Sequence, residues 1–348
     1  MNPELPDILR HWPRTSRPIE INPTRLQCLI NSSLDHHPCL REHRFLEHGA
    51  DNSNYQLLFD NRSPLLLRIH RAPRSSPQRY RALFHRLDEP TYLANPLAIV
   101  SAPVDGEPHT ASLRRWVPGV DLHSRLNRPP LLSPSLFQKL GAWIAHYHLH
   151  ISFEGPALLD DELRPRRRFT SHGDALIDFV QWSISKGPAA ATVSPPLKQR
   201  LTTTLDRHHS RLRQLPAHSG LVHGDLNLGN ILVSNSKSSA PTVQAIIDWD
   251  YARSGSVYLD LAVLHRHRQL LPPQSMAALR RGLHCGGIEL PDDWRHVAQL
   301  FDLQHIVGRL NAPSLGHSHQ QSLMRYLDSA LDSINSPNAS SSLSNNAS

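Results

Sequence analysis

The 348-residue chain has few cysteines and no long apolar run, and both absences exclude classes of protein. Its three cysteines, Cys28, Cys39 and Cys285, are widely spaced and form no Cys-x-x-Cys pair, so we expect neither a disulfide framework nor a zinc site. The longest apolar stretches are short and broken by charged residues, which predicts no transmembrane helix and no membrane partner. Residues 1–6 lack the basic start and apolar core of a signal peptide. Together these features favour the cytoplasm.

The formal net charge of +7 would suit a protein that binds nucleic acid. The arginines are dispersed along the chain, however, apart from the run at residues 164–168. That run lacks the interleaved aromatic residues of a surface that binds single strands. We therefore expect a solvated basic loop there and no nucleic-acid partner.

The 24 histidines do not form a recognisable metal site. His146 and His150 would share one face of a helix, but no third ligand of suitable type and spacing accompanies them. We expect these two histidines to be part of the helical scaffold.

The first third of the chain predicts a small antiparallel sheet with one helix packed beside it. Short apolar runs bounded by Gly, Asn, Asp and Pro indicate strands, and Ser76 followed by Pro77 has the composition of a helix start. The expected elements are a helix over 23–34, strands over 44–47, 55–59 and 65–69, a helix over 77–87, and strands over 97–102 and 111–117.

Everything after the Pro-Gly break at residues 118–119 is predicted to be mainly helical. Helices are expected over 134–150, 174–185, 196–214, 258–269, 274–284, 292–309 and 318–334. Residues 335–348 are almost all Ser, Asn and Ala, a composition that cannot bury enough apolar area to order itself, so we expect a disordered tail. The chain has no internal repeat.

Three polar residues stand at the ends of apolar runs in the second half of the chain. Asp225 and Asn230 lie five residues apart in a loop between two strand-like segments, and Asp248 closes the next apolar run. Phosphoryl transfer needs a carboxylate that accepts the proton of an attacking hydroxyl, and oxygen ligands for Mg²⁺. The pattern predicts Asp225 as the catalytic base and the other two residues as metal ligands.

At these residues the chain resembles the aminoglycoside phosphotransferase and choline/thiamine kinase superfamily, the small-molecule branch of the protein-kinase-like fold. Residues 223–230 are similar to its His-Gly-Asp-x-x-x-x-Asn loop, residues 247–252 to its metal-binding segment, and residues 259–262 to its Asp-Leu-Ala helix start. The resemblance implies ATP and Mg²⁺ as cofactors and supporting roles for His223 and Asp260.

The resemblance also implies an α+β fold of two lobes. The N-lobe would be a small antiparallel sheet that binds nucleotide, and the C-lobe would be larger, mainly helical, and would hold the catalytic and substrate-binding groups. The predicted units are a helical extension over 1–40, the N-lobe over 41–117, the C-lobe over 118–334 and the tail over 335–348.

By the same resemblance, the hairpin at 49–54 faces the phosphates, and Arg68 takes the position of a phosphate-binding Lys. The adenine would bond to backbone at Arg115 and Val117. The family's helix usually supplies a Glu partner for the phosphate-binding cation, but residues 77–87 contain none. The residues expected to bind nucleotide are therefore Gly49, Ser53, Asn54, Arg68, Arg115 and Val117.

The acceptor is expected to be a small-molecule hydroxyl, because a carboxylate base suits its deprotonation. The spelling of residues 248–252 is closest to choline, ethanolamine and thiamine kinases, and an acid beside aromatic rings could hold a cation. Asp250, Tyr251 and Trp182 are the candidates to contact an amino alcohol or thiamine-like cation. Asp160, Asp161 and Asp178 could add to such a site. The alternatives are an aminoglycoside or amino-sugar kinase, and a nucleotide-binding pseudokinase, which the missing helix Glu favours.

Two other patterns compete with this interpretation. Residues 172–174 repeat His-Gly-Asp, but Phe179 stands where the second metal ligand would be, so a helix start is expected there. The Gly-Asp and Gly-Asn pairs around the loop are also typical of metallophosphoesterases. Those enzymes need a His directly after the Asn, and Ile231 occupies that position.

Overall fold

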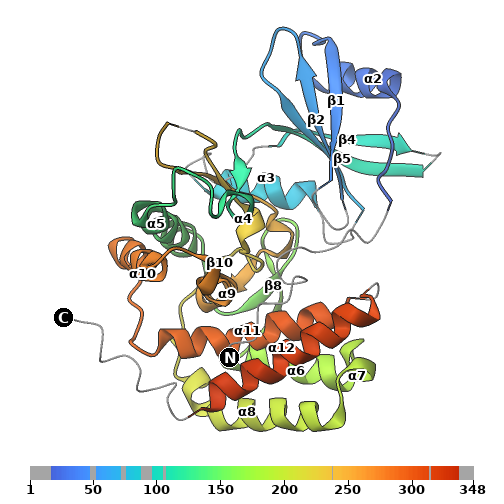
Figure 1. The fold of residues 1–348 in the computed structure, drawn as a ribbon. Coiled ribbons are helices and arrows are strands. Elements are labelled where there is room, and N and C mark those ends of the chain that lie inside the picture. Colours follow the sequence, from blue (N-terminus) through green and yellow to red (C-terminus); the bar gives the residue numbers. More distant parts are fainter. Residues whose placement is uncertain are drawn as a thin grey trace.

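An antiparallel sheet formed by the first third of the chain lies above a larger, mainly helical region (Figure 1). The computed structural model describes residues 17–47, 52–71, 76–87, 96–104, 107–236, 238–312 and 315–336. Within these ranges no helix is long and apolar enough to cross a membrane. The mixed α+β architecture is the one predicted.

The N-terminal sheet has five antiparallel strands in the order β1-β2-β3-β5-β4. Their bounds are β1 (Leu40–Leu46), β2 (Ser53–Phe59), β3 (Leu65–Ile69), β4 (Pro96–Val104) and β5 (Glu107–Arg115). Alternate residues of β2 point inward, and Leu57 is fully buried with Leu67 of β3. Helix α2 (Pro23–Ser33) covers this core with Leu26 and Ile30.

Helix α3 (Pro77–Arg86) starts where the sequence predicts. Ser76 caps it by accepting a hydrogen bond from the backbone N–H of Arg79 at 3.4 Å, and the proline at the first position has no N–H to lose. Tyr80 and Leu83 of α3 are buried in the core of the C-terminal region, so this helix joins the two parts of the molecule.

The C-terminal region contains most of the helices, and the long ones fall close to their predicted ranges. They are α4 (Leu122–Arg125), α5 (Pro134–His150), α6 (His172–Ser185), α7 (Ala189–Thr192), α8 (Pro195–Arg213), α9 (Tyr258–Arg266), α10 (Ser275–Cys285), α11 (Trp294–Leu310) and α12 (His317–Asn335). Helices α5 and α10 pack closely: a Cβ on Gly141 would lie 2.2 Å from the carbonyl oxygen of Leu279.

Two small sheets hold the segments that contain the three polar residues. One has the order β7-β10-β13-β8-β9 and the other the order β12-β11-β6. Their strands are β6 (Val120–Asp121), β7 (Ser152–Phe153), β8 (Ala157–Leu159), β9 (Pro165–Arg168), β10 (Ser219–Val222), β11 (Ile231–Val233), β12 (Val243–Ile246) and β13 (Arg253–Gly255). Two 3₁₀ turns, Leu228–Asn230 and Trp249–Tyr251, complete the segments.

The basic run at 164–168 was expected to be a loop, and this expectation is wrong. Residues Pro165–Arg168 form β9, an edge strand that pairs with β8. Charged side chains are well suited to an edge strand, because they remain solvated while the backbone pairs on one side. Arg164 beside it donates to Asp160 at 2.9 Å, so part of the positive charge is balanced locally.

The start of α6 and the end of α12 can be compared with their predicted positions. Helix α6 starts at His172, where Ser171 accepts a hydrogen bond from the N–H of Asp174 at 3.0 Å, so the repeated His-Gly-Asp is a helix start as predicted. Helix α12 continues to Asn335, one residue into the expected tail, and the Asn335 amide donates to Thr204 Oγ1 at 2.8 Å. Residues 337–348 lie outside the described residues.

Candidate active site

Buried hydrogen bonds fix the shape of the loop that follows β10. The carboxylate of Asp260, at the start of α9, accepts from the backbone N–H groups of His223 and Gly224, at 2.9 Å each, and from the Tyr147 hydroxyl at 2.7 Å. Gly224 has φ +80°, and a Cβ there would lie 2.4 Å from the carbonyl oxygen of Tyr251. Only glycine fits this position without displacing backbone.

The imidazole of His223 joins this loop to the segment before Asp248. Its Nε2 lies 2.8 Å from the carbonyl oxygen of Ile247, and its Nδ1 lies 3.2 Å from the backbone N of Asp225. The hydrogen bonds assign the tautomer: Nε2–H donates to the carbonyl, and Nδ1 accepts from the N–H. His223 and Asp260 thus both contact the backbone of the loop and not the space where a ligand would lie.

The carboxylate of Asp225 contacts the loop on one side and α11 on the other. Its side chain is 27% exposed, so it is within reach of a ligand. Oδ2 accepts from the Asn227 amide at 3.2 Å, and Oδ1 lies 3.4 Å from Nη2 of Arg309 on α11. Arg309 was not predicted as a site residue, because no motif marks it and 84 residues separate it from Asp225.

Asn230 and Asp248 lie together at one end of the β11–β12 hairpin. Ile231 pairs with Ile246, and the N–H of Ile247 donates to the carbonyl oxygen of Asn230 at 2.9 Å. Asp248 has a left-handed backbone (φ +66°), a conformation that Asp tolerates better than most residues.

The donor set at this end of the hairpin fits Mg²⁺. The side-chain nitrogen of Asn230 donates to the backbone carbonyl of Asp225 at 2.9 Å, which leaves the amide oxygen for a ligand. The Asp248 carboxylate is 39% exposed. Mg²⁺ prefers carboxylate and amide oxygens and usually takes its remaining ligands from substrate phosphates and water. Within the described ranges no cluster of three His, Cys, Asp or Glu forms a more complete metal site.

The guanidinium of Arg68 on β3 contacts both acidic residues of the segment after β12. Its Nη2 donates to Asp248 Oδ1 at 2.8 Å and to Asp250 Oδ2 at 2.6 Å. Burial opposes ionisation of Asp248, but the charge of Arg68 outweighs it and holds the pKa of this carboxyl below its usual value. The carboxylate partners that α3 does not supply therefore come from residues 248–250.

Helix α3 contacts the same segment through Tyr80 and Arg79. The Tyr80 hydroxyl accepts from the backbone N–H of Trp249 at 2.8 Å, and Arg79 donates to the carbonyl oxygen of Asp250 at 2.9 Å. The guanidinium of Arg114 lies 3.6 Å from the centre of the Tyr80 ring, a cation–π contact. These contacts could not be predicted from local patterns, because they join residues far apart in the chain.

The nucleotide-binding residues expected on β1–β3 are only partly placed. Gly49 lies outside the described residues. Ser53 is fully buried, and its hydroxyl accepts from the backbone N–H of Ile19 at 2.8 Å. Asn54 pairs with Arg68 in the β2–β3 register. The Ser53 side chain is thus bonded to the N-terminal segment.

The two residues expected to meet the adenine lie where the sheet leads into the helical region. Arg115 is exposed and ends β5, opposite Leu65 of β3. Val117 is two residues further and half-buried. Between them, the N–H of Trp116 donates to the carbonyl oxygen of Pro64 at 3.3 Å.

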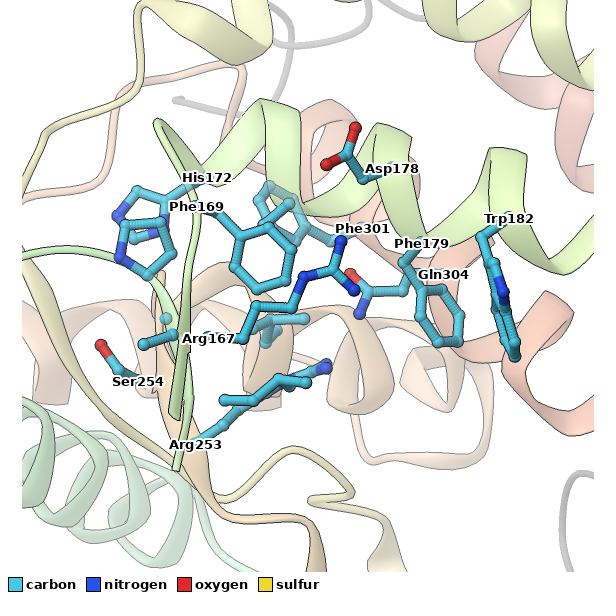
Figure 2. A pocket seen from close by; sticks show the side chains of 16 residues that line it. Arg167, Phe169, His172, Asp178, Phe179, Trp182, Arg253, Ser254, Phe301 and Gln304 are labelled. Atoms are coloured by element: carbon cyan, nitrogen blue, oxygen red, sulfur yellow. The ribbon is translucent and has the colours of Figure 1, made fainter. Parts of the chain in front are cut away.

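The candidates for cation binding are separated by the structure. Asp250 is 7% exposed and bonded to Arg68, whereas Tyr251 is 45% exposed and Trp182 is 50% exposed on α6. Of these three, Trp182 lines a hollow that is bounded by α6, the β8–β9 hairpin, β13 and α11. Figure 2 shows this hollow.

The hollow lies beside the loop that contains Asp225 and is lined by polar residues that were not predicted. Arg253 pairs with Val222, at the end of β10, and Gln304 lies five residues before Arg309 on α11. Figure 2 shows Phe179 and Trp182 descending from α6 on one side, with Arg253 below them and Gln304 behind. No short motif contains Arg253 or Gln304.

Comparisons with known proteins identify the family of the chain. The model of the phosphotransferase enzyme family matches residues 42–326. No curated protein sequence matches. Among solved structures, the aminoglycoside phosphotransferase APH(4)-Ia, bound to ADP and hygromycin B, shares 15% identity with a TM-score of 0.63, covering 85% of this chain and 93% of that one.

Two further solved structures with the same fold are named for other substrates. The macrolide 2'-phosphotransferase MphH from Brachybacterium faecium shares 17% identity with a TM-score of 0.58, covering 87% of this chain and 98% of that one. A candidate fructosamine-3-kinase from Thermobifida fusca shares 17% identity with a TM-score of 0.56, covering 89% and 98%. At such identities the likeness shows the fold alone, but the family model spans most of the chain. The chain therefore belongs to the phosphotransferase enzyme family and is a small-molecule phosphotransferase.

Proposed function

We propose that the protein transfers the γ-phosphoryl group of ATP to a hydroxyl of a small molecule, with Mg²⁺. The observation that carries the proposal is the meeting of Asp225, Asn230 and Asp248: the Asn230 amide bonds the carbonyl of Asp225, and its own carbonyl bonds the residue before Asp248. The bound ADP of the aminoglycoside phosphotransferase structure supports an adenine nucleotide.

In this mechanism Asp225 accepts the proton of the acceptor hydroxyl as its oxygen bonds to the γ-phosphorus and the bond to the ADP oxygen breaks. Asn230 and Asp248 would hold Mg²⁺, which supplies charge neutralisation on the phosphates. Arg68 would bind phosphate oxygens from the sheet side while Asp250 orients its guanidinium. Arg309 keeps the Asp225 carboxylate in place from α11.

The finer proposal concerns an acceptor with an amino group, such as an amino alcohol, a thiamine-like cation or an amino sugar. Three of the acids that could hold the cation are engaged elsewhere: Asp250 bonds Arg68, Asp160 bonds Arg164, and Asp161 lies 3.6 Å from Arg79. Asp178 and Trp182, both on α6 and both lining the hollow, remain as the groups that could meet an ammonium.

The pseudokinase alternative depended on the missing helix Glu. In the structure Arg68 is bonded to two carboxylates, so the absence of Glu from α3 does not leave this cation unpositioned. That observation favours turnover over nucleotide binding alone.

An ATP-consumption screen tests the proposal. Choline, ethanolamine, thiamine, neutral sugars and aminoglycosides would be offered with Mg²⁺ and ATP, with Asp225→Asn as the matched inactive enzyme. We expect acceptor-dependent ADP formation that this variant loses. ATP binding without turnover on any acceptor would support the pseudokinase instead.

A further inference from the structure

Arg253 is a cation in the wall of the hollow whose partner is neutral. With the Gln304 carboxamide turned so that its oxygen faces the guanidinium, both terminal nitrogens of Arg253 donate to that oxygen at 3.0 Å. Its Nε has no hydrogen-bond partner, and no carboxylate in the described part of the chain lies within ion-pair distance of it.

Arg266, a second arginine that contacts α11, differs from Arg253 in having a carboxylate partner. Arg266 on α9 is fully shielded from solvent, and its Nε donates to Asp302 of α11 at 2.9 Å. Two residues further along α11, Gln304 faces Arg253 with an uncharged amide. A buried charge without a counter-charge is costly, so the hollow has a position where an anion would be stabilised.

Arg253 is charged at neutral pH. Burial lowers its pKa to about 10, and the charge of Asp260 partly opposes this decrease. Asp260 is already committed to the Tyr147 hydroxyl and the backbone of the catalytic loop, so it does not pair directly with Arg253. The Arg253 cation is therefore only partly compensated by the protein, through a charge that lies beyond ion-pair distance.

The other charged groups of the hollow lie nearer to solvent. Arg167, on the exposed edge strand β9, adds a second positive charge. His172 lies deeper and adds no charge at neutral pH, because burial lowers the pKa of its imidazole. Asp178 is exposed on α6, and Figure 2 shows its carboxylate pointing away from Arg253. The inner end of the hollow is thus positive, with the aromatic ring of Phe179 on its wall.

We propose that Arg253 and Gln304 bind an acidic group, a carboxylate or phosphate, of the compound that the enzyme phosphorylates. Arginine suits both groups, because its terminal nitrogens can donate to two oxygens at once. The inference rests on the proposed function, since it assigns the hollow to the phosphoryl acceptor.

The spacing of Gln304 and Arg309 along α11 would allow one acceptor molecule to reach both Arg253 and Asp225. Gln304 and Arg309 are five residues apart on this helix, which is about 7–8 Å along its axis at 1.5 Å per residue. Arg309 contacts Asp225, so a compound of about six carbons could place its acidic group at Arg253 and a hydroxyl at the base. An amino group on the same compound would lie toward Asp178 at the rim.

Calorimetric binding without nucleotide tests the inference. The probes are gluconate, glucose 6-phosphate and glucose, which share six carbons and differ in having a carboxylate, a phosphate or no charge. The variants are Arg253→Gln and, as the matched control, Arg166→Gln, because Arg166 is exposed on β9 and alternates in direction with Arg167.

We expect at least one of the two anions to bind the parent protein more tightly than glucose. That anion should bind Arg253→Gln about 10-fold or more weakly, the usual effect of losing hydrogen bonds to a charged group. Arg166→Gln should bind it as the parent does, and Arg167→Gln should weaken it by less than Arg253→Gln. A melting curve for each variant verifies that the fold is intact.

Two results would overturn the inference: neither anion binds the parent better than glucose, or Arg253→Gln retains the parent affinity. If Arg253→Gln proves unfolded, the response of the folded Arg167→Gln decides, and parent-like affinity there counts against the inference. A separate titration with Mg²⁺–ATP distinguishes this failure from failure of the proposed function, because Arg253 lies outside the proposed metal site. If the enzyme phosphorylates only cationic compounds, the proposed kinase function stands and the inference of an acidic acceptor is wrong.

Discussion

Arg68 on β3 and Asp250, 182 residues later, lie 2.6 Å apart between Nη2 and Oδ2, and both side chains are buried. The contact joins the N-terminal sheet to the segment that contains the proposed metal ligand. It also explains how Arg68, the proposed phosphate-binding cation, can be positioned although α3 has no glutamate.

Asp250→Ala tests whether this carboxylate positions Arg68 or contacts the substrate. The substitution leaves a buried guanidinium with Asp248 alone, so we expect a loss of about 2–3 kcal/mol, somewhat less than for a fully broken buried pair. The melting temperature should fall by several degrees. In the control, Asp161→Ala removes an exposed partner 3.6 Å from Arg79 and should cost under about 1 kcal/mol. If both variants melt alike and Asp250→Ala raises the acceptor KM, Asp250 is a substrate residue instead.

Nucleotide affinity should depend on Mg²⁺ and on the Asp248 carboxylate. Asp248→Asn removes the charge while keeping a side chain that tolerates the left-handed backbone. We expect its Kd for ATP with Mg²⁺ to rise about 10-fold or more, with little change when Mg²⁺ is absent. Isothermal titration of both forms measures this, and Asp206→Ala on the exposed face of α8 is the control. Equal affinities for ATP in the parent with and without Mg²⁺ would argue against the metal site.

The stability of the fold should decrease in mild acid because His148 is buried in its neutral form. Burial lowers the pKa of His148 to about 4, although its hydrogen bond to the Leu221 carbonyl opposes the shift. The contribution of His148 to the free energy of unfolding is complete above about pH 6.5, where its imidazole is neutral in both the folded and the unfolded chain. It is lost as the pH falls toward 4, because the unfolded chain takes up a proton first. The loss amounts to about 3 kcal/mol.

Urea unfolding at several pH values measures this effect. His148→Gln should reduce the slope of unfolding free energy against pH between 6.5 and 4 by about one proton. An unchanged slope in His148→Gln would show that this histidine is protonated in the folded protein.

The end of the chain should be dispensable only beyond the last contacts of α12. A chain that ends at Ser336 should melt within about a degree of the full-length protein, because the removed residues have too little apolar area to order themselves. A chain that ends at Ile334 also loses Asn335, which bonds Thr204 and accepts from Arg207 at 2.7 Å. It should melt a few degrees lower. A large loss in the longer of the two chains would mean that residues 337–348 dock on the fold.

The long helices and the central strands of the N-terminal sheet could be predicted because their signals are local. Helix α5 has the predicted bounds 134–150, and β3 the predicted bounds 65–69. Proline at the first helical position and clear apolar periodicity mark such elements. The short strands β7, β8 and β9 were missed, since two to four residues are too few for a periodic pattern.

The residues of the candidate site could likewise be predicted only where their signals are local. Asp225, Asn230 and Asp248 lie within two recognisable motifs, so the sequence alone predicts that they share a site, and the structure brings them together. Arg253 and Arg309 reach the site only through tertiary packing, and neither forms part of a motif. Hydrogen bonds between residues so far apart in the chain depend on the completed fold, which local patterns do not encode.

The most direct test of the account is the turnover number of Asp225→Asn with the acceptor that the ATP screen identifies. The exchange keeps the size of the side chain and removes the base, so kcat should fall by about 10²–10⁴, with the Kd for Mg²⁺–ATP nearly unchanged. Asn227→Ala, which removes only a hydrogen-bond donor to that carboxylate, should reduce kcat by far less. A kcat for Asp225→Asn within a few-fold of the parent would contradict the assignment of Asp225 as the base.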